Sequence, residues 1–344
     1  MFRATQDTPR PNAAGFVPAH GLYDPAQERD ACGVGFVARL DGQADHALVR
    51  DAVKVLVNLE HRGARGGDAA TGDGAGLLLG LPHAFFARVM QEEGFHLPEP
   101  GAYAVGMLFL PADADLRQRC LAVFDRAVDD EGLRVIGGRD VPTVGDHLGD
   151  LARTTQPAVH QVFVAHRGVG VGDLERRLYV VRRVVEKEIA SLEDVDTSQF
   201  YVASLSSRTV VYKGMLTGTQ LEQFYPDLLD PDFAAPFAVV HQRYSTNTLP
   251  TWSLAQPFRM LAHNGEINAL RGNISHMRAR EADLESEAFG TDLVKILPVV
   301  IEGGSDSAIF DNVLELLVRD GRSLPHAAMM MVPEAWGDAF TMGA

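Results

Sequence analysis

Three short runs of the sequence combine the residue types that amide hydrolysis needs. Cys32 stands in the run Asp30–Phe36, and it is one of only two cysteines in the chain of 344 residues. A second run, His241–Asn247, holds an arginine followed by hydroxyl residues, and a third, His263–Ile267, contains an Asn-Gly pair. A thiol can act as a nucleophile, a guanidinium can hold a carboxylate, and amide N–H groups can stabilise an oxyanion. The three runs therefore predict an amide-hydrolysing site.

Each of these residues also has an ordinary structural interpretation. A free cysteine beside a glycine-rich strand is usually buried and unreactive, and Asn264-Gly265 has the sequence of the commonest hairpin turn. Arg243 could form a salt bridge at a strand end, and Asp306 could cap a helix. The spacing favours the catalytic interpretation, because His263 follows Arg243 by only 20 positions.

Composition limits the classes of protein to consider. The net charge of -15 argues against a broad nucleic-acid surface, which needs a basic face. No apolar run reaches the length of a membrane span, and the first thirty residues lack the apolar core of a secretory signal. Two distant cysteines provide no metal-binding spacing, and Cys120 falls within a helical apolar pattern. We expect a reduced, cytoplasmic protein that binds no metal and in which Cys120 is structural.

The flanking elements must position the three runs. Met1–Ala31 is expected to be irregular, because four prolines interrupt it. Order is expected from Cys32 onward, with a buried strand at 33–38 and an amphipathic helix over Leu48–Leu59. A glycine-rich loop, His61–Gly76, then leads into the strand Leu77–Leu81. The loop lacks the ending of a P-loop and the spacing of a calcium loop, and we interpret it as a cover for the substrate pocket.

The middle of the chain predicts a separate module. Its pattern is β-α-β-β-α-β, which is typical of a ferredoxin-like split βαβ unit inserted into a β-rich core over residues 103–205. The expected elements are the strands Tyr103–Leu110, Leu133–Ile136, Gln161–Ala165 and Phe200–Leu205 and the helices Leu116–Val128 and Leu174–Ile189. This module carries no obvious chemistry, so we expect it to serve packing or interaction.

The last third of the chain returns to the core. The strands Thr209–Lys213, Phe237–Gln242 and Met260–His263 are predicted there, followed by the helices Ile267–Ala282 and Ser307–Arg319. The chain stops at residue 344 without the features of a domain end, and we expect that its C-terminus is truncated from a longer protein.

Together these motifs resemble the glutaminase domain of the class II glutamine amidotransferases, which are N-terminal-nucleophile (Ntn) hydrolases. The resemblance is closest to the glutamate synthase branch, and it covers Cys32 to Trp336. It implies an α+β fold, a four-layer αββα sandwich, in a domain spanning 32–344 that follows a leader, 1–31. In the family the cysteine becomes the first residue after cleavage, and its α-amino group acts as the base. An α-amine with a pKa of about 7.7–8 suits that task.

The resemblance also implies the substrate and the role of each site residue. L-Glutamine would be hydrolysed to glutamate and ammonia through a γ-glutamyl thioester on the nucleophilic cysteine. Asn264 and Gly265 would form the oxyanion hole. Arg243 and Thr246 would hold the α-carboxylate of glutamine, and Asp306 would hold its α-ammonium group.

Full-length members of the glutamate synthase branch continue into domains that use FMN and an iron–sulfur cluster to make glutamate from ammonia and 2-oxoglutarate. The resemblance therefore implies no cofactor in this chain itself. It implies C-terminal synthase domains as partners, with a small electron-donating subunit or ferredoxin as the source of electrons. Two alternatives remain open. The chain could be another N-terminal-nucleophile amidohydrolase, or an unprocessed, inactive fragment that only binds a partner.

Overall fold

The computed structural model describes residues 18–19, 21, 33–167, 174–192, 195–243, 249–265, 267, 269–301 and 303–332. It divides the chain into two compact units, Met1–Cys32 and Gly33–Ala344. Cys32, Thr246 and nearly all of the expected leader lie outside the described residues. The second unit contains all the helices and strands described below.

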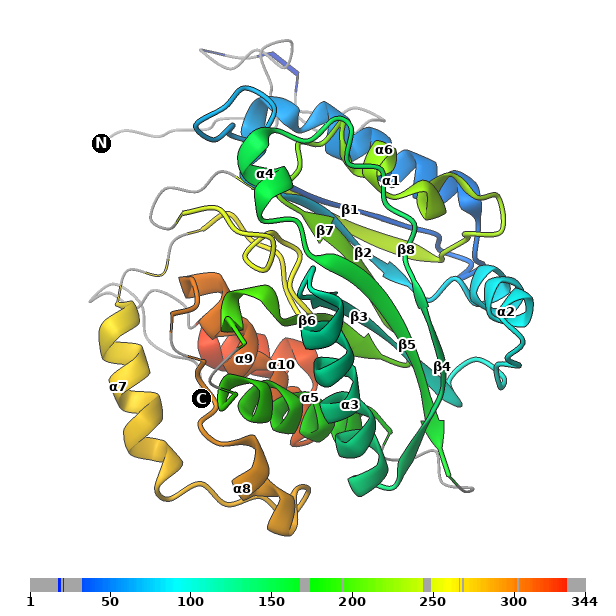
Figure 1. The fold of residues 1–344 in the computed structure, drawn as a ribbon. Helices are drawn as coiled ribbons and strands as arrows, with labels where there is room; N and C mark the ends of the chain where they lie inside the picture. Colours follow the sequence, from blue (N-terminus) through cyan, green and yellow to red (C-terminus); the bar gives the residue numbers. More distant parts are fainter. Residues whose placement is uncertain are drawn as a thin grey trace, which may run out of the picture. The chain divides into compact units, whose positions relative to one another are not determined.

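The first sheet joins the two segments that carry the first two sequence runs. Its four strands follow the order β1-β8-β2-β7, and every neighbouring pair is antiparallel (Figure 1). The strands are β1 (Val34–Ala38), β2 (Ala75–Gly80), β7 (Thr209–Gly214) and β8 (Phe237–Gln242). The register pairs Val34 with His241 and Ala75 with Gln242. It therefore aligns the residues after Cys32 with the residues before Arg243, although more than 200 positions separate them.

Helix α1 (His46–Asn58) covers the first sheet, as its apolar spacing predicts. The Asp45 side chain caps its first turn by accepting a hydrogen bond from the Ala47 N–H at 2.8 Å. The buried face of α1 comprises Leu48, Val49, Ala52, Val53 and Leu56, and these residues belong to the same hydrophobic cluster as the strands.

The second sheet is formed by the middle of the chain. Its strands are β3 (Tyr103–Leu110), β4 (Leu133–Asp140), β5 (Ala158–His166) and β6 (Tyr201–Ser206), in the order β4-β5-β3-β6 with antiparallel neighbours. Helices α3 (Ala114–Asp130) and α5 (Leu174–Ala190) pack on one face of it and enclose a hydrophobic cluster that contains Cys120. The predicted strands and helices of this region are present. β4 and β5 are longer than expected, and a short helix, α4 (Asp150–Thr154), separates them.

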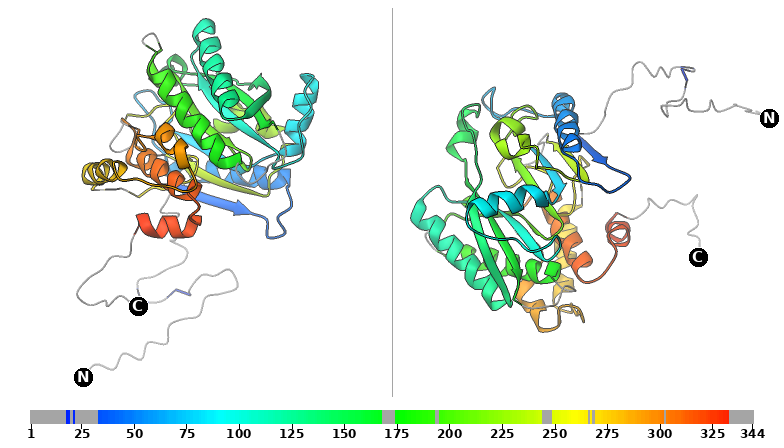
Figure 2. Two further views of the ribbon diagram at one scale, coloured as in Figure 1. Left: turned by 90° about the horizontal axis from the view of Figure 1, so that it is seen from below. Right: turned by 90° about the vertical axis from the view of Figure 1, so that its right-hand side faces the viewer.

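A larger hydrophobic cluster connects the other face of the second sheet with the first sheet and with α1. Tyr103, Val105, Met107 and Phe109 of β3 alternate with the residues that face α3 and α5. The strands accordingly lie between α1 on one side and α3 with α5 on the other (Figure 1; Figure 2, right).

The remaining elements are helices and short turns that connect or cover the two sheets or follow them in the last third of the chain. They are α2 (His83–Glu92), α6 (Leu221–Phe224), α7 (Leu270–Glu281), α8 (Leu293–Ile296), α9 (Asp306–Arg319) and α10 (Leu324–Met331), with short 3-10 turns at Glu60–Arg62, Thr197–Gln199, Pro226–Leu229 and Gly290–Asp292. None of the helices in the described ranges is long and apolar enough to cross a membrane.

One predicted strand is absent. Residues 260–263 are irregular, because side chains rather than a neighbouring strand take up their backbone hydrogen bonds. The Met260 N–H donates to Asp311 Oδ1 at 2.8 Å, and the His263 N–H donates to Gln256 Oε1 at 3.0 Å. A run of four residues is too short for periodicity to distinguish a strand from such a segment.

Candidate active site

Gly33, the residue that follows Cys32 in the sequence, lies against two segments from far along the chain. Its carbonyl oxygen accepts a hydrogen bond from the Gln242 N–H at 2.7 Å. A Cβ atom on Gly33 would lie 2.3 Å from the Gln242 carbonyl oxygen and 2.7 Å from Nδ2 of Asn264. Only glycine fits this position, and the close approach brings the Asn264 amide to the start of β1.

Arg243 follows β8 and is held by the glycine-rich loop. Its N–H donates to the Gly74 carbonyl at 2.8 Å, and its carbonyl oxygen accepts from the Ala64 N–H at 3.2 Å. Its guanidinium Nη1 donates to the Asp73 carbonyl at 3.3 Å, and the residue is only 6% exposed. Burial lowers the pKa of the guanidinium, and the carboxylates of Asp73 and Asp306 counteract that effect. An arginine remains charged under such conditions, so Arg243 presents a partly desolvated cation.

The buried half of the loop, Thr71–Gly76, is packed against the rest of the structure. Thr71 Oγ1 donates to Asp68 Oδ2 at 2.7 Å and accepts from the Ala152 N–H at 3.3 Å. This half supports Arg243. The interpretation of the loop as a cover for the substrate pocket stays a prediction for its more exposed half, 61–70.

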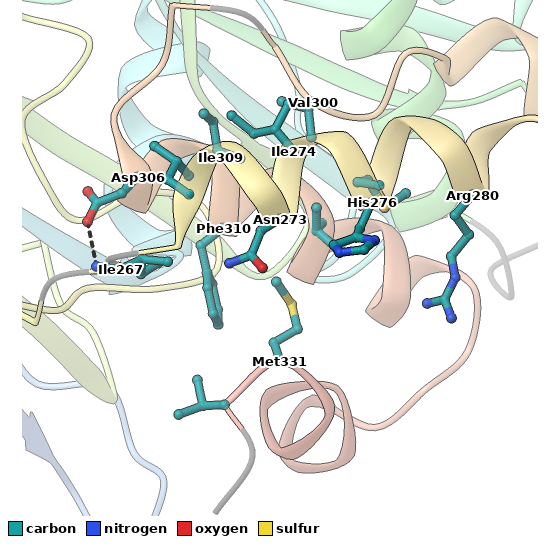
Figure 3. Close-up of a pocket in the computed structure, with 14 residues that line it drawn as sticks. Ile267, Asn273, Ile274, His276, Arg280, Val300, Asp306, Ile309, Phe310 and Met331 are labelled. Atoms are coloured by element: carbon teal, nitrogen blue, oxygen red, sulfur yellow. Dashed lines mark hydrogen bonds between the residues drawn. The ribbon is translucent and has the colours of Figure 1, made fainter. Parts of the chain in front are cut away.

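Asp306 is the first residue of α9, and its carboxylate faces Ile267. Oδ2 accepts from the Ile267 N–H at 3.1 Å (Figure 3), and Oδ1 accepts from the Ser307 N–H at 2.7 Å. The N-cap of α9 is Ser305, whose side chain accepts a hydrogen bond from a backbone N–H of the first turn. The interpretation of Asp306 as the helix cap is therefore wrong by one position. Its carboxylate instead links α9 to the segment that carries Asn264 and Gly265.

A cavity of about 630 Å³ opens beside Asp306 between α7, α9 and α10 (Figure 3). Its walls are mainly apolar, as the side chains of Phe310 and Met331 illustrate. Neither Arg243 nor Asn264 lines it. The cavity therefore reaches Asp306 but neither Arg243, the predicted carboxylate ligand, nor Asn264, the predicted oxyanion donor.

Asn264 and Gly265 lie at the exposed end of a loop that His263 anchors. The His263 carbonyl accepts from Gln256 Nε2 at 3.2 Å and from His241 Nε2 at 3.1 Å. The described residues before the Asn-Gly pair form no strand, so the pair is not the turn of a β-hairpin. A loop whose base is fixed and whose tip is exposed can present amide donors to a ligand.

His241 and Gln256 are part of this arrangement, and the sequence analysis did not single them out. His241 is only 1% exposed, and burial lowers the pKa of its imidazole to about 4. The His263 backbone and the nearby Asn264 side chain oppose that shift in pKa, and the charges of His263 and Arg243 add to it. The signal in the sequence was a histidine directly after the apolar run Phe237–Val240.

The structure thus brings together Asn264 with Gly33, and Arg243 with Asp306 through their opposite charges. Cys32 and Thr246 fall outside the described ranges, so their roles stay predictions. In the part of the chain that the structure describes, no group of three or more His, Cys, Asp or Glu side chains could hold a metal ion.

The sequence model of the family "Glutamine amidotransferases class-II" matches residues 32–344. This chain belongs to that family. The match begins at Cys32, and it includes each of the predicted site residues. Class II glutamine amidotransferases are enzymes, so the chain carries an enzymatic domain.

Curated relatives of this amidotransferase domain are glutamate synthases. The chain is 47% identical over 320 residues to the glutamate synthase [NADPH] large chain of Bacillus subtilis. This match covers 92% of this chain and 21% of that protein. It is 42% identical over 335 residues to the glutamate synthase [NADH] of Schizosaccharomyces pombe, covering 95% of this chain and 16% of the relative. It is 45% identical over 312 residues to the ferredoxin-dependent glutamate synthase 2 of Synechocystis, and the match covers 90% of this chain and 20% of that protein. The chain therefore spans about a fifth or less of the length of these relatives.

Behind the amidotransferase site, a buried ion network fixes the segment that leads to His263. Arg259 pairs with Asp311 at 3.1 Å and with Glu315 at 3.2 Å, both on α9. Glu315 also pairs with Arg182 of α5 at 2.6 Å. These four side chains are at most 6% exposed, and buried charges of this kind depend on their partners. The network therefore links α5, α9 and the base of the Asn264 loop.

Proposed function

We propose that this chain is the glutaminase domain of a glutamate synthase, which hydrolyses L-glutamine to glutamate and ammonia. The observation that supports it most directly is the position of the Asn264 amide against Gly33, directly after Cys32 in the sequence. A donor at that position suits an oxyanion formed when the Cys32 thiolate attacks the side-chain amide of glutamine.

The mechanism begins with cleavage between Ala31 and Cys32, which would free the α-amino group of Cys32. Before cleavage this nitrogen belongs to a peptide bond and cannot accept a proton. The start of the family match at Cys32 supports this boundary. After cleavage the amine takes the thiol proton, and the thiolate attacks the amide carbon of the glutamine side chain. An N-terminal amine has a pKa of about 7.7–8, which is suited to accepting and returning a proton near neutral pH.

The oxyanion of the tetrahedral intermediate would receive hydrogen bonds from the Asn264 side chain and the Gly265 N–H. The protonated amine then gives its proton to the departing nitrogen, ammonia leaves, and a γ-glutamyl thioester remains on Cys32. The same amine deprotonates a water molecule, which attacks the thioester carbonyl. Collapse of this second intermediate breaks the C–S bond, releases glutamate and returns the proton to the thiolate.

Two opposite charges would select the free amino-acid end of the substrate. Arg243 would bind the α-carboxylate as a bidentate cation, assisted by the hydroxyl of Thr246. Asp306 would bind the α-ammonium group with the carboxylate that now accepts the Ile267 N–H. Because such a pair matches an amino acid rather than an amide inside a peptide, it disfavours the alternative of another N-terminal-nucleophile amidohydrolase.

The domain organisation that goes with this function is a four-layer αββα sandwich over 32–344, preceded by a leader, 1–31. Residues 103–205 would be a ferredoxin-like insertion. The order β4-β5-β3-β6, with α3 and α5 on one face, supports that proposal because the split βαβ unit has this arrangement.

In the parent enzyme the ammonia would pass to synthase domains outside this chain for reductive amination of 2-oxoglutarate. FMN and the iron–sulfur cluster would be bound there, and a small subunit or ferredoxin would supply the electrons. The names of the relatives support the synthase, but they specify NADPH, NADH and ferredoxin at similar identity. The sequence similarity therefore supports the glutamate-forming reaction that these enzymes share, and it favours none of the three electron donors.

The deciding experiment is intact-mass spectrometry before and after treatment with an electrophilic glutamine analogue, combined with assays of glutamine hydrolysis. We expect a mass that begins at Cys32, one adduct on that residue, and no hydrolysis by Cys32→Ala. Cys120→Ala is the matched control, because Cys120 is fully buried and burial raises the pKa of its thiol. This control should keep both the adduct and the activity. An uncut chain without an adduct would favour the inactive-fragment alternative.

A further inference from the structure

His241 lies on β8, the strand that leads to Arg243, and its side chain reaches the loop that carries Asn264. Its partner in the register of the first sheet is Val34, two residues after Cys32. Its Nε2 lies 3.1 Å from the carbonyl oxygen of His263. Since a carbonyl oxygen can only accept, Nε2 carries the proton and Nδ1 of the neutral ring is left as an acceptor.

Nδ1 of His241 is buried and has no hydrogen-bond partner among the described residues. The Asn264 side chain lies close enough to the imidazole to raise its pKa against the effect of burial. The Asn264 amide offers two N–H bonds, and its nitrogen is the atom that lies against Gly33. One N–H can therefore meet Nδ1 while the other points toward Gly33.

We propose that His241 is a positioning residue for the oxyanion hole, an inference that rests on the proposed glutaminase function. Its Nε2–H holds the His263 carbonyl, and its Nδ1 accepts one N–H of Asn264 when glutamine is bound. The lone pair on Nδ1 repels the Asn264 carbonyl oxygen. It thereby selects the amide orientation in which nitrogen, rather than oxygen, points to the developing oxyanion.

The surroundings of His241 keep its ring in the form that this task requires. Burial disfavours the charged ring, and the neighbouring His263 and Arg243 add to that effect. The His263 carbonyl and the Asn264 side chain act in the opposite direction but are weaker than burial. A protonated ring would donate from Nδ1 and would attract the Asn264 oxygen, which is the wrong orientation for an oxyanion donor.

The test compares His241→Phe and His241→Gln in the full 344-residue chain, with His46→Phe as the control. His46 also bonds a backbone carbonyl, that of Phe233, but it lies on α1. We expect His241→Phe to lower kcat for glutamine by about 10- to 100-fold, because loss of a whole oxyanion donor costs about 10²- to 10³-fold. KM should change little. His241→Gln should recover most of kcat, because its amide can donate to His263 and accept from Asn264.

Alkylation of Cys32 by iodoacetamide separates positioning of Asn264 from general damage. This displacement at a saturated carbon forms no oxyanion, so His241→Phe should be alkylated at the wild-type rate. An unchanged kcat in His241→Phe, or equal losses of kcat and of alkylation, would overturn the role of His241. A wild-type chain that neither hydrolyses glutamine nor reacts at Cys32 would overturn the proposed function, and this inference with it.

Nitrogen-15 spectra of the imidazole in the wild-type protein provide a readout that needs no variant to fold. We expect a neutral ring with the proton on Nε2 at pH 7. A proton on Nδ1 in the neutral ring, or a charged ring at that pH, would contradict the proposal directly.

Discussion

Acid should destabilise this protein through His241. Burial lowers the pKa of this imidazole from 6.5 to about 4. Between these two pH values the unfolded chain binds a proton at His241 and the native protein does not. The contribution of the neutral ring to stability is therefore complete above pH 6.5 and is lost as the pH falls to about 4. Below that range both states are protonated and no further loss arises from this residue.

The size of the effect follows from the depressed pKa. At 1.36 kcal/mol per unit, a shift from 6.5 to about 4 amounts to about 3 kcal/mol. That is a substantial part of the roughly 5–15 kcal/mol by which native domains are stable. His241→Gln keeps an amide in place of the imidazole but has no proton to gain, so it should lack this acid sensitivity.

Urea unfolding at several pH values between 7.5 and 4.5 would measure the effect. The carboxylates titrate in both proteins, so the difference between wild type and His241→Gln isolates the histidine. We expect that difference to move by about 2–3 kcal/mol in favour of the variant as the pH falls. Parallel stability curves across this range would refute the reasoning, because they would mean that the imidazole is as easily protonated in the native state as in the unfolded chain.

Three substitutions test other parts of the structure. Arg243→Ala should raise KM for glutamine by roughly 10- to 100-fold, since a hydrogen bond to a charged group contributes about 1.5–3 kcal/mol. If steady-state kinetics show an unchanged KM, Arg243 does not bind the α-carboxylate of glutamine. Gly33→Ala should destabilise the fold by about 2–3 kcal/mol in urea unfolding, because the added Cβ atom would lie 2.3 Å from the Gln242 carbonyl oxygen. Gly67→Ala is the control and should be nearly neutral, because a Cβ atom there meets nothing within 4 Å. Arg139→Met should cost about 3–5 kcal/mol of stability by leaving the buried carboxylate of Asp227 without its ion-pair partner. Adding Asp227→Leu should recover most of that loss, and a double variant as unstable as the single one would show that the charge is not the cause.

Local patterns in the sequence were sufficient for most of the fold. The alternation of apolar residues and the helical spacing in 103–205 predicted the β-α-β-β-α-β order that is present, since neighbours a few residues apart determine which face of an element is buried. The run of four residues at 260–263 was predicted wrongly as a strand. Its hydrogen-bond partners are the side chains of Gln256 and Asp311, and no local pattern reveals such partners. The cap of α9 was misplaced by one residue because Ser305 and Asp306 are both residue types that suit an N-cap.

The sequence by itself determined which residues could do chemistry: an arginine, an Asn-Gly pair and an acidic residue at a helix start, at spacings typical of one family. Only the tertiary structure decided how they are used. The sheet register brings Gly33 to Gln242 and Asn264, the packed loop holds Arg243 in a partly desolvated position, and burial makes His241 a neutral acceptor. These properties depend on contacts between residues up to 231 positions apart and on the exclusion of water, and neither is encoded in the residue types near each motif.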